Sequence, residues 1–314
     1  MAGEEQHDGK GAGLDKELLR EVRRLQIRTD RLVTDLVSGG YSSVFRGAGI
    51  EFDEVREWTE GDDFRSVDWN VTARQGRPFI KKFVEERELT LLVLLDRSRS
   101  MRFGSRPDGR SLARIAAEFV ATIGVSATRS GDKLGFLSFG SARQELYLPP
   151  KKGRSQLMRL LRECLCEPAR ELSPEEEDAA LQRALAYAGR VQRKRAIVFV
   201  VSDFLLSLPR RELALLSKRH DLTLVSCSDP RLREIPAGGL LRVIDLESGQ
   251  ERLVDTRSAK LRQRYAEQAR ERSEQLAATA RRAGAGLLAL STERPVGGDI
   301  LGFFRRREMR GRHR

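Results

Sequence analysis

Three oxygen-bearing side chains occupy every second position in the stretch LLVLLDRSRSM, Leu91 to Met101. They are Asp96, Ser98 and Ser100, and they directly follow an unbroken apolar run. In an extended turn, side chains two positions apart project from the same side. Carboxylate and hydroxyl oxygens are ligands that a hard cation such as Mg²⁺ accepts together with water. The spacing favours a magnesium site, although a strand followed by a polar loop, with a serine capping the next helix, fits it as well.

A second acid follows another apolar run. Asp203 comes immediately after AIVFVVS, residues 196–202. In open α/β sheets, ligands bind beyond the carboxyl ends of the strands. If both runs form parallel strands, Asp96 and Asp203 lie at the same edge of the sheet. The sequence therefore predicts a divalent cation held by Asp96, Ser98, Ser100 and Asp203, directly or through water.

The apolar runs that would position these acids recur through the second part of the chain. They are short, as is typical of strands covered on both faces, and read TLLVLL, LGFLSF, AIVFVVS, LTLVS and GLLALS. Helical patterns separate most of them, at residues 112–128, 156–165, 175–191, 210–219 and 257–283. Strands alternating with helices predict an α/β fold with an open, mostly parallel sheet and helices on both faces. Residues 231–255 interrupt the alternation and predict a small hairpin around Ser248-Gly249.

The first part of the chain has a different character. Apolar residues at helical spacing predict a helix over residues 14–37, which Ser38-Gly39-Gly40 would end. The piece VDWNVTARQGRPFIKKF, residues 67–83, predicts two short strands joined at Gln75-Gly76. We expect a disordered N-terminus at 1–13, a helix and small β subdomain at 14–88, the α/β domain at 89–302 and a basic tail at 303–314.

Charge limits the partners that this chain could bind. Its 314 residues carry a net charge of +12, which suits acidic proteins, nucleic acid or anionic lipid. The end of the chain, FFRRREMRGRHR, holds six arginines against one glutamate, and such a run predicts a solvated, disordered tail.

Composition also bears on the compartment. No run approaches the roughly 18 apolar residues of a membrane span, and the start lacks the layout of a signal peptide. The three cysteines, Cys164, Cys166 and Cys227, are too few for a disulfide framework and poorly spaced for zinc. We therefore expect a cytoplasmic protein without a transmembrane segment.

The strand that ends in Asp96-Arg97-Ser98-Arg99-Ser100 resembles the opening of a von Willebrand factor A-type domain. Such domains carry Asp-x-Ser-x-Ser after the first strand, a threonine on a second loop and an aspartate after a later strand. Together these residues form a metal-ion-dependent adhesion site. GDKLGFLSF, residues 131–139, resembles the second core strand, and VVSDF, residues 200–204, resembles the strand that delivers the last aspartate.

The preceding block narrows the resemblance. GAGIEFDEVREWTEGDDFRSVDWNVTARQGRPFIKKFVEERE, residues 47–88, is similar to the signature of the domain of unknown function 58 family, in which it leads directly into an A-type domain. The resemblance implies a von Willebrand factor A-like, Rossmann-like fold and Mg²⁺ at the residues named above. It also implies a MoxR-type AAA+ ATPase as partner.

The chain departs from the A-type pattern at two places. The second-loop threonine should lie near Ala179, where Asp178 is the adjacent oxygen donor and an additional candidate ligand. Ser173, the nearest hydroxyl upstream, is better explained as the cap of a helix that begins Ser-Pro-Glu-Glu. Arg97 and Arg99 fill the variable positions of the motif, and they either point to solvent or compete with a cation.

The signature block packs charges of both signs into a short stretch. We expect a structural ion-pair network that ties the β subdomain to the A-type domain, because arginine pairs with carboxylates in a fixed, two-toothed geometry. A surface that recognises another protein is the alternative. The residues are Arg56, Asp62, Asp63, Arg65, Asp68 and Arg74. Trp58 and Trp69 are expected to anchor a small core.

The motifs of common enzymes are missing from the sequence. There is no phosphate-binding Gly-x-x-x-x-Gly-Lys loop and no kinase catalytic loop, and none of His7, His220 and His313 is placed to activate a nucleophile. We expect a non-enzymatic interaction adaptor that acts with the ATPase in remodelling or maturing another complex. The alternative is a protein that binds nucleic acid or anionic membrane through its basic tail and long C-terminal helix, although nucleic acid is disfavoured because no recognised binding motif is present.

Overall fold

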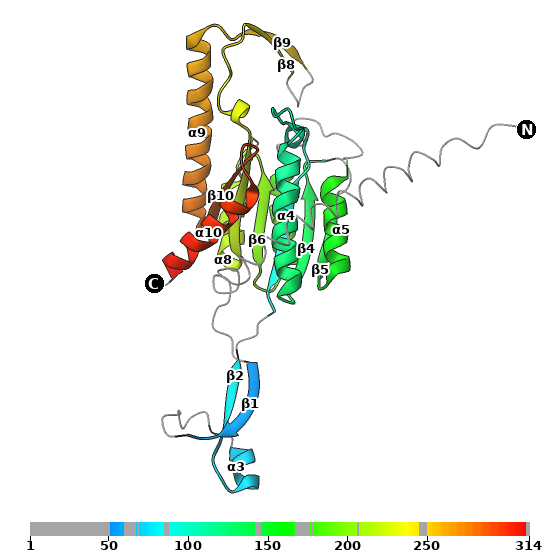
Figure 1. Cartoon of the computed structure of the whole chain (residues 1–314), viewed down its shortest axis with the longest axis vertical. Helices are drawn as coiled ribbons and strands as arrows, with labels where there is room; N and C mark the ends of the chain where they lie inside the picture. Colours follow the sequence, from blue (N-terminus) through cyan, green and yellow to red (C-terminus); the bar gives the residue numbers. More distant parts are fainter. Residues whose placement is uncertain are drawn as a thin grey trace, which may run out of the picture.

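The computed structural model describes residues 51–59, 67, 69–84, 88–141, 146–166, 176, 179–205, 207–244 and 250–311. Its main body is an α/β domain in which one six-stranded sheet lies between two layers of helices (Figure 1). The expected N-terminal disorder at 1–13 and the helix expected at 14–37 lie outside the described residues.

The sheet confirms the five predicted strands and adds one at an edge. The strand order is β10-β7-β6-β3-β4-β5, and all neighbours are parallel except β4 and β5. The bounds are β3 Thr90–Asp96, β4 Lys133–Phe139, β5 Tyr147–Lys151, β6 Ile197–Ser202, β7 Asp221–Ser228 and β10 Gly286–Ser291. The added strand, β5, reads YLPPK. Its two prolines make the stretch look unlike a strand, because proline is tolerated in a sheet chiefly at an edge.

Helices cover both faces of the sheet, as predicted. One face is packed by α4 Leu112–Arg129, α5 Arg154–Leu165 and α10 Val296–Gly311. The other is packed by α7 Ala180–Val191, α8 Arg210–Arg219 and α9 Ala259–Ala283. The strands are buried because successive side chains alternate between these two cores: Leu91 and Val93 belong to the first, Leu92 and Leu94 to the second.

The end of the chain corrects the expected tail. Residues 303–311 are the second part of α10, so a tail that starts at residue 303 is wrong for them. Phe303 and Phe304 are buried in the core, and the Arg307 guanidinium is bonded to Asp221. The arginines dominate the composition of this stretch, but the same helix has an apolar face that packs on the sheet. Residues 312–314 lie outside the described part.

The small N-terminal unit contains a strand pair and a helix. Strand β1 (Glu51–Glu57) pairs antiparallel with β2 (Phe79–Val84), but the strand predicted before Gln75-Gly76 is wrong, because Trp69–Gln75 forms helix α3. Gly76 has a φ of +68°, the left-handed conformation that commonly ends a helix. Trp69 is 62% exposed, which contradicts its expected role as a core anchor.

The predicted ion-pair network falls largely outside the described residues. Asp62, Asp63, Arg65 and Asp68 are not among them, and only the backbone of Arg56 is described, in β1. Arg74 is exposed in the last turn of α3. The network therefore stays a prediction.

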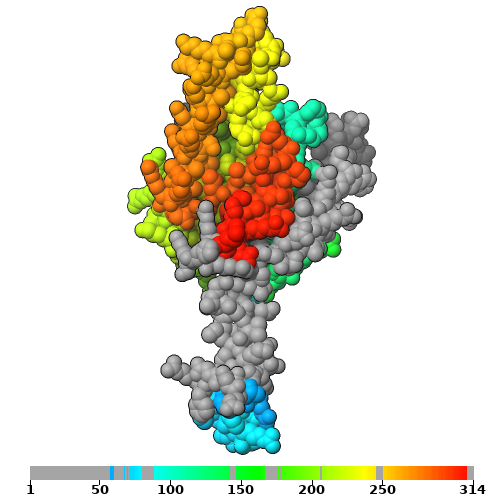
Figure 2. Space-filling view, turned by 60° about the vertical axis from the view of Figure 1, so that its left-hand side comes forward, coloured from blue at the N-terminus to red at the C-terminus, as the bar shows by residue number. Residues whose placement is uncertain are grey.

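A hairpin and the long helix α9 extend beyond the rest of the domain. Strands β8 (Leu240–Ile244) and β9 (Glu251–Asp255) pair antiparallel and confirm the predicted hairpin, whose connecting residues 245–249 lie outside the described set. Helix α9 spans 25 residues, about 37 Å, and Figure 2 shows it beside the hairpin at one end of the molecule. None of the helices in the described part is long and apolar enough to cross a bilayer.

Candidate metal centre at the carboxyl edge of the sheet

The strand order of the sheet reverses between β3 and β6. From β3 the chain first builds outward through β4 and β5, and then crosses to the other side to form β6, β7 and β10. Ligands of open α/β sheets bind where the order reverses in this way, beyond the carboxyl ends of the strands. Asp96 is the last residue of β3 and Asp203 follows β6 directly, so both predicted acids lie at this edge, at the ends of two adjacent strands.

Asp96 is a buried acid held by neutral donors. Its side chain is 1% exposed, Oδ1 accepts from the backbone N–H of Ser98 at 2.9 Å, and Oδ2 accepts from Ser202 Oγ at 2.6 Å. No described lysine or arginine forms an ion pair with it. Burial raises the pKa of Asp96 above its ordinary value, although the hydrogen bonds from Ser202 and Ser98 act the other way. A cation beside this carboxylate would offset the cost of burying its charge.

The two serines of the motif are also buried and adjacent. Ser98 and Ser100 are 3% and 8% exposed, and their hydroxyls form a hydrogen bond in which the Oγ atoms lie 3.0 Å apart. With Mg–O distances of about 2.1 Å, neighbouring ligands in an octahedron lie about 3.0 Å apart. Ser98 precedes a short 3-10 helix without a side-chain capping bond, and Ser111 caps α4 instead. The hydrogen-bonded spacing of the two hydroxyls matches that of neighbouring ligands, and neither serine caps α4.

Asp203 sits in a tight turn after β6. It is 9% exposed, and its Oδ1 accepts from the Leu205 N–H at 3.2 Å. Phe204 has a φ of +54°, an uncommon conformation for a residue other than glycine. Burial raises the pKa of the Cys227 thiol well above its ordinary value, and the charges of Asp203 and Asp96 act in the same direction. Both acids therefore lie near the same buried thiol.

Ser202 is a site residue that the sequence reasoning missed. Its hydroxyl donates to Asp96 and accepts from the Phe204 N–H at 2.9 Å. It thereby links the ends of β3 and β6 and orients Asp96. Its only sequence signal is a hydroxyl at the end of an apolar strand, next to an acid, and its partner lies 106 residues away along the chain.

The remaining candidates have different outcomes. Arg97 does not point to solvent: it is 7% exposed, and its guanidinium bonds to the carbonyl of Cys166 at the end of α5. Arg99 is half-buried in the short helix after the motif. Asp178 lies outside the described residues, so its role as an additional ligand stays a prediction.

A third acid at this edge, Asp229, has a structural role. It is fully buried, and it accepts hydrogen bonds from Ser105 Oγ (2.5 Å), the Ser105 N–H (3.2 Å), the Arg231 N–H (2.9 Å) and Thr292 Oγ (2.6 Å). Burial pushes the pKa of Asp229 up, but these bonds outweigh it and the pKa lies below its ordinary value. Each of its oxygens accepts two hydrogen bonds, whereas each oxygen of Asp96 accepts one, and these bonds join the ends of β7 and β10 to the loop before α4.

The donor set fits a hard cation. In the described part of the chain no group of three or more histidine, cysteine or acidic side chains is placed to bind a metal, which makes a soft-metal centre of that kind a poor fit there. Asp96, Ser98, Ser100 and Asp203 instead offer carboxylate and hydroxyl oxygens, the ligands that suit Mg²⁺ when water completes the shell.

Gly140 closes the site from β4. A Cβ at this position would lie 2.6 Å from Asp96 Oδ1 and 3.0 Å from the Ser98 nitrogen, and its φ is +76°. We expect Gly140→Ala to lower the free energy of unfolding by about 2–4 kcal/mol, through left-handed strain plus overpacking. Urea denaturation measures the loss.

Gly131→Ala is the matched control for that variant, since Gly131 has a φ of +72° with open space where the Cβ would lie. It should cost only the strain, about 1–2 kcal/mol. Equal losses for the two variants would contradict close packing of Gly140 against Asp96.

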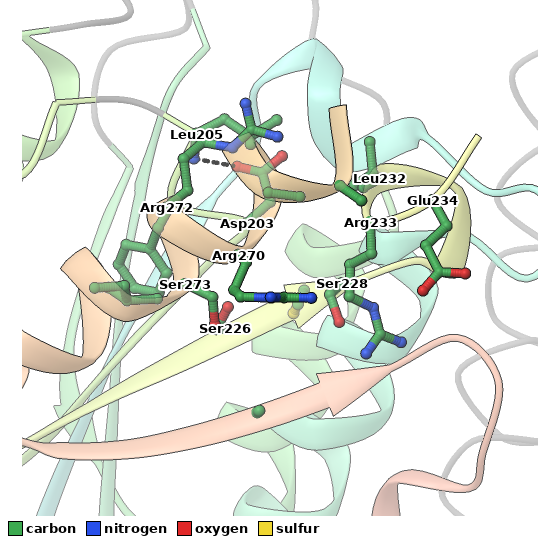
Figure 3. A pocket seen from close by; sticks show the side chains of 16 residues that line it. Asp203, Leu205, Ser226, Ser228, Leu232, Arg233, Glu234, Arg270, Arg272 and Ser273 are labelled. Carbon is green, nitrogen blue, oxygen red and sulfur yellow. Dashed lines mark hydrogen bonds between the residues drawn. The ribbon is translucent and has the colours of Figure 1, made fainter. Parts of the chain in front are cut away.

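A cavity of about 370 Å³ opens beside this centre. Asp203, Phe204 and Leu205 form one wall, and β7 and α9 form others. Figure 3 shows Asp203 at its edge, with arginines of α9 and of the segment after β7 around it.

Comparisons with known proteins match most of this chain to a protein family and to a relative. A family model described as "Protein of unknown function DUF58" matches residues 54–275. An uncharacterised protein of Mycobacterium tuberculosis is 31% identical over 291 residues, which cover 92% of this chain and 89% of that protein.

Two solved structures are similar in fold. An aerotolerance-related membrane protein from Bacteroides fragilis, with multiple mutations to serines, aligns over 71% of this chain and 99% of its own, at 14% identity and a TM-score of 0.40. The VWA domain of SpRpn10 aligns over 68% of this chain and 94% of its own, at 12% identity and a TM-score of 0.34.

Proposed function

The chain belongs to the DUF58 family, with a von Willebrand factor A-like fold, and from this premise we propose that it is a cytoplasmic interaction adaptor rather than an enzyme. Its docking face is the carboxyl edge of the sheet. The observation that carries the proposal is the buried Asp96 with neutral donors only, beside two serine hydroxyls 3.0 Å apart.

Asp96, Ser98, Ser100 and Asp203 would hold Mg²⁺, directly or through water. When bound, the ion offers an open coordination position to a carboxylate of the partner. Ser202 donates to the Asp96 carboxylate and holds it in place, and Asp203 is the next residue after Ser202. Gly140 leaves room for Asp96 on the side of β4.

The proposed partner is a MoxR-type AAA+ ATPase, as the family resemblance implies. Under this proposal ATP hydrolysis belongs to the partner, and the adaptor directs it to another complex for remodelling or maturation. Within the described residues, no histidine forms a hydrogen bond with Asp96 or with the two serines, so the proposal assigns them no catalytic role.

The test measures binding between the purified chain and the MoxR-type ATPase of the same organism. Wild type should bind in Mg²⁺, and chelation with EDTA or the change Asp96→Ala should weaken binding at least about tenfold, the cost of losing a desolvated charged contact. Glu271→Gln, an exposed carboxylate on α9, is the control that removes a charge elsewhere. Unchanged binding by Asp96→Ala would reject the docking face.

The rival function is binding to nucleic acid or anionic membrane. The net charge of +12 and the exposed Arg305 and Arg306 on α10 favour it. Such binding would fall steeply with salt and persist in EDTA. Strong salt dependence combined with indifference to chelation would therefore favour the rival over the adaptor.

A further inference from the structure

The cavity beside Asp203 has a polar floor. Ser226 and Ser228 of β7 line it together with Ala289 of β10. In the sheet register Ser226 pairs with Ser202 on one side and with Ala289 on the other. The floor therefore continues directly from the strand end that orients the candidate metal site.

Helix α9 leaves the cavity open because its residues there are small. Ala266, Ala269 and Ser273 line it, and Leu276, one turn further along the same face, closes it as a buried side chain. Buried residues of α9 occur only from Leu276 onward. Larger side chains at the preceding positions would fill the space, so the part of α9 before Leu276 spans the edge of the sheet without packing on it.

Arginines surround the opening. Figure 3 shows Arg270 and Arg233 on the two sides of Ser228, and Arg272 also lines the cavity. Within the described residues, neither Arg270 nor Arg272 forms an ion pair, and the Ser226 hydroxyl has no hydrogen-bond partner. Arg233 pairs at 3.2 Å with Glu293, and both side chains are largely exposed. Guanidinium groups bind carboxylates through two parallel hydrogen bonds.

The charge balance depends on Asp203. Its carboxylate would repel an anion, but a cation at the metal site would neutralise it. The three arginines then face only Glu234 among the other acids that line the cavity. The cavity volume of about 370 Å³ is near the lower end of the range for ligand pockets, which suits a short side chain or a turn of peptide.

We propose that this cavity binds a second carboxylate of the partner, next to the one that completes the metal site. This inference rests on the proposed function and sharpens it. The recognised element is an acidic segment with at least two carboxylates, one at the cation and one between Arg270 and Arg233. A single acidic side chain would engage only half of the surface.

Fluorescein-labelled octaglutamate tests the inference by fluorescence anisotropy in Mg²⁺ at physiological ionic strength. Arg270→Glu should raise the Kd about tenfold or more. Ala269→Leu keeps every charge but fills the cavity, and it should weaken binding as well. Arg281→Glu makes the same charge change in the last turn of α9, away from the cavity, and should alter the Kd less than about threefold because salt screens remote charges. Circular dichroism checks that each variant folds.

The outcomes separate this inference from the proposed function. If Asp96→Ala weakens octaglutamate binding but Arg270→Glu and Ala269→Leu do not, the metal-dependent docking face is supported and the cavity proposal is wrong. If both cavity variants weaken octaglutamate binding but EDTA and Asp96→Ala leave it unchanged, the cavity binds acidic peptide and the metal-dependent function is wrong. Equal effects of Arg270→Glu and Arg281→Glu would indicate general charge attraction and overturn the cavity, as would absence of binding by wild type.

Discussion

Asp96→Asn is expected to raise the unfolding midpoint of the metal-free protein rather than lower it. Asparagine has the same shape, its carbonyl oxygen can accept from the Ser98 N–H, and its amide can donate to the Ser202 oxygen. The Ser202 O–H then loses its acceptor, a cost smaller than that of the buried charge. The change removes a buried charge that has no ion-pair partner, and such charges cost several kcal/mol. We expect a gain of about 1–3 kcal/mol, or roughly 3–10 °C for a domain of this size.

Magnesium should make wild type more stable than Asp96→Asn, the reverse of the order expected without metal. A ligand that binds only the folded state stabilises it by about 2.7 kcal/mol at one hundred times its Kd. Wild type should gain this stability from Mg²⁺, whereas Asp96→Asn should gain little. Differential scanning fluorimetry with EDTA and with a Mg²⁺ series measures both effects.

The exposed Glu271→Gln serves as the control for this experiment, because it removes a charge without touching the site, and its response to Mg²⁺ should match that of wild type. A destabilised Asp96→Asn protein in EDTA would mean that Asp96 is a structural acceptor. If the unfolding midpoint of wild type did not change with Mg²⁺ concentration, the site would hold no such ion.

The architecture was predictable because the strands are buried on both faces. Runs such as TLLVLL and AIVFVVS carry no polar alternation, and helices separate them, so a parallel sheet follows from hydrophobic burial alone. Asp96 and Asp203 were predictable for the same reason, since each terminates such a run. That the two acids follow adjacent strands depends on β3 and β6 being neighbours, a property of the strand order.

What escaped prediction depends on contacts between distant residues. Ser202 bonds to Asp96 across 106 positions, and Gly140 is required by the space beside Asp96 rather than by a local turn pattern alone. Phe303 and Phe304 were assigned to a solvated tail because the arginines after them dominate the composition. Only the packing of α10 on the sheet shows that these two rings belong to the core.

Asp229 and Asp96 lie at the same edge of the sheet, yet replacing them should have opposite effects. Asp229→Asn places an amide donor against the hydroxyls and N–H groups that now donate to the carboxylate. At least one buried donor loses its partner, and another bond to a charged acceptor is weakened. We expect the free energy of unfolding to fall by about 2–4 kcal/mol in urea denaturation at neutral pH.

The pH dependence provides an independent check on Asp229. The pKa of this carboxyl is lower in the folded state than its ordinary value. Its contribution is therefore fully present above the unfolded-state value of about 3.9 and is lost as the pH falls through the folded-state pKa. The difference between wild type and Asp229→Asn should accordingly shrink in acid.

Ser105→Ala, which keeps the backbone donor, should cost only about 1 kcal/mol. If Asp229→Asn were as stable as wild type at neutral pH, the hydrogen bonds of this carboxylate would not hold β7, β10 and the loop before α4 together, and its distinction from Asp96 would be lost.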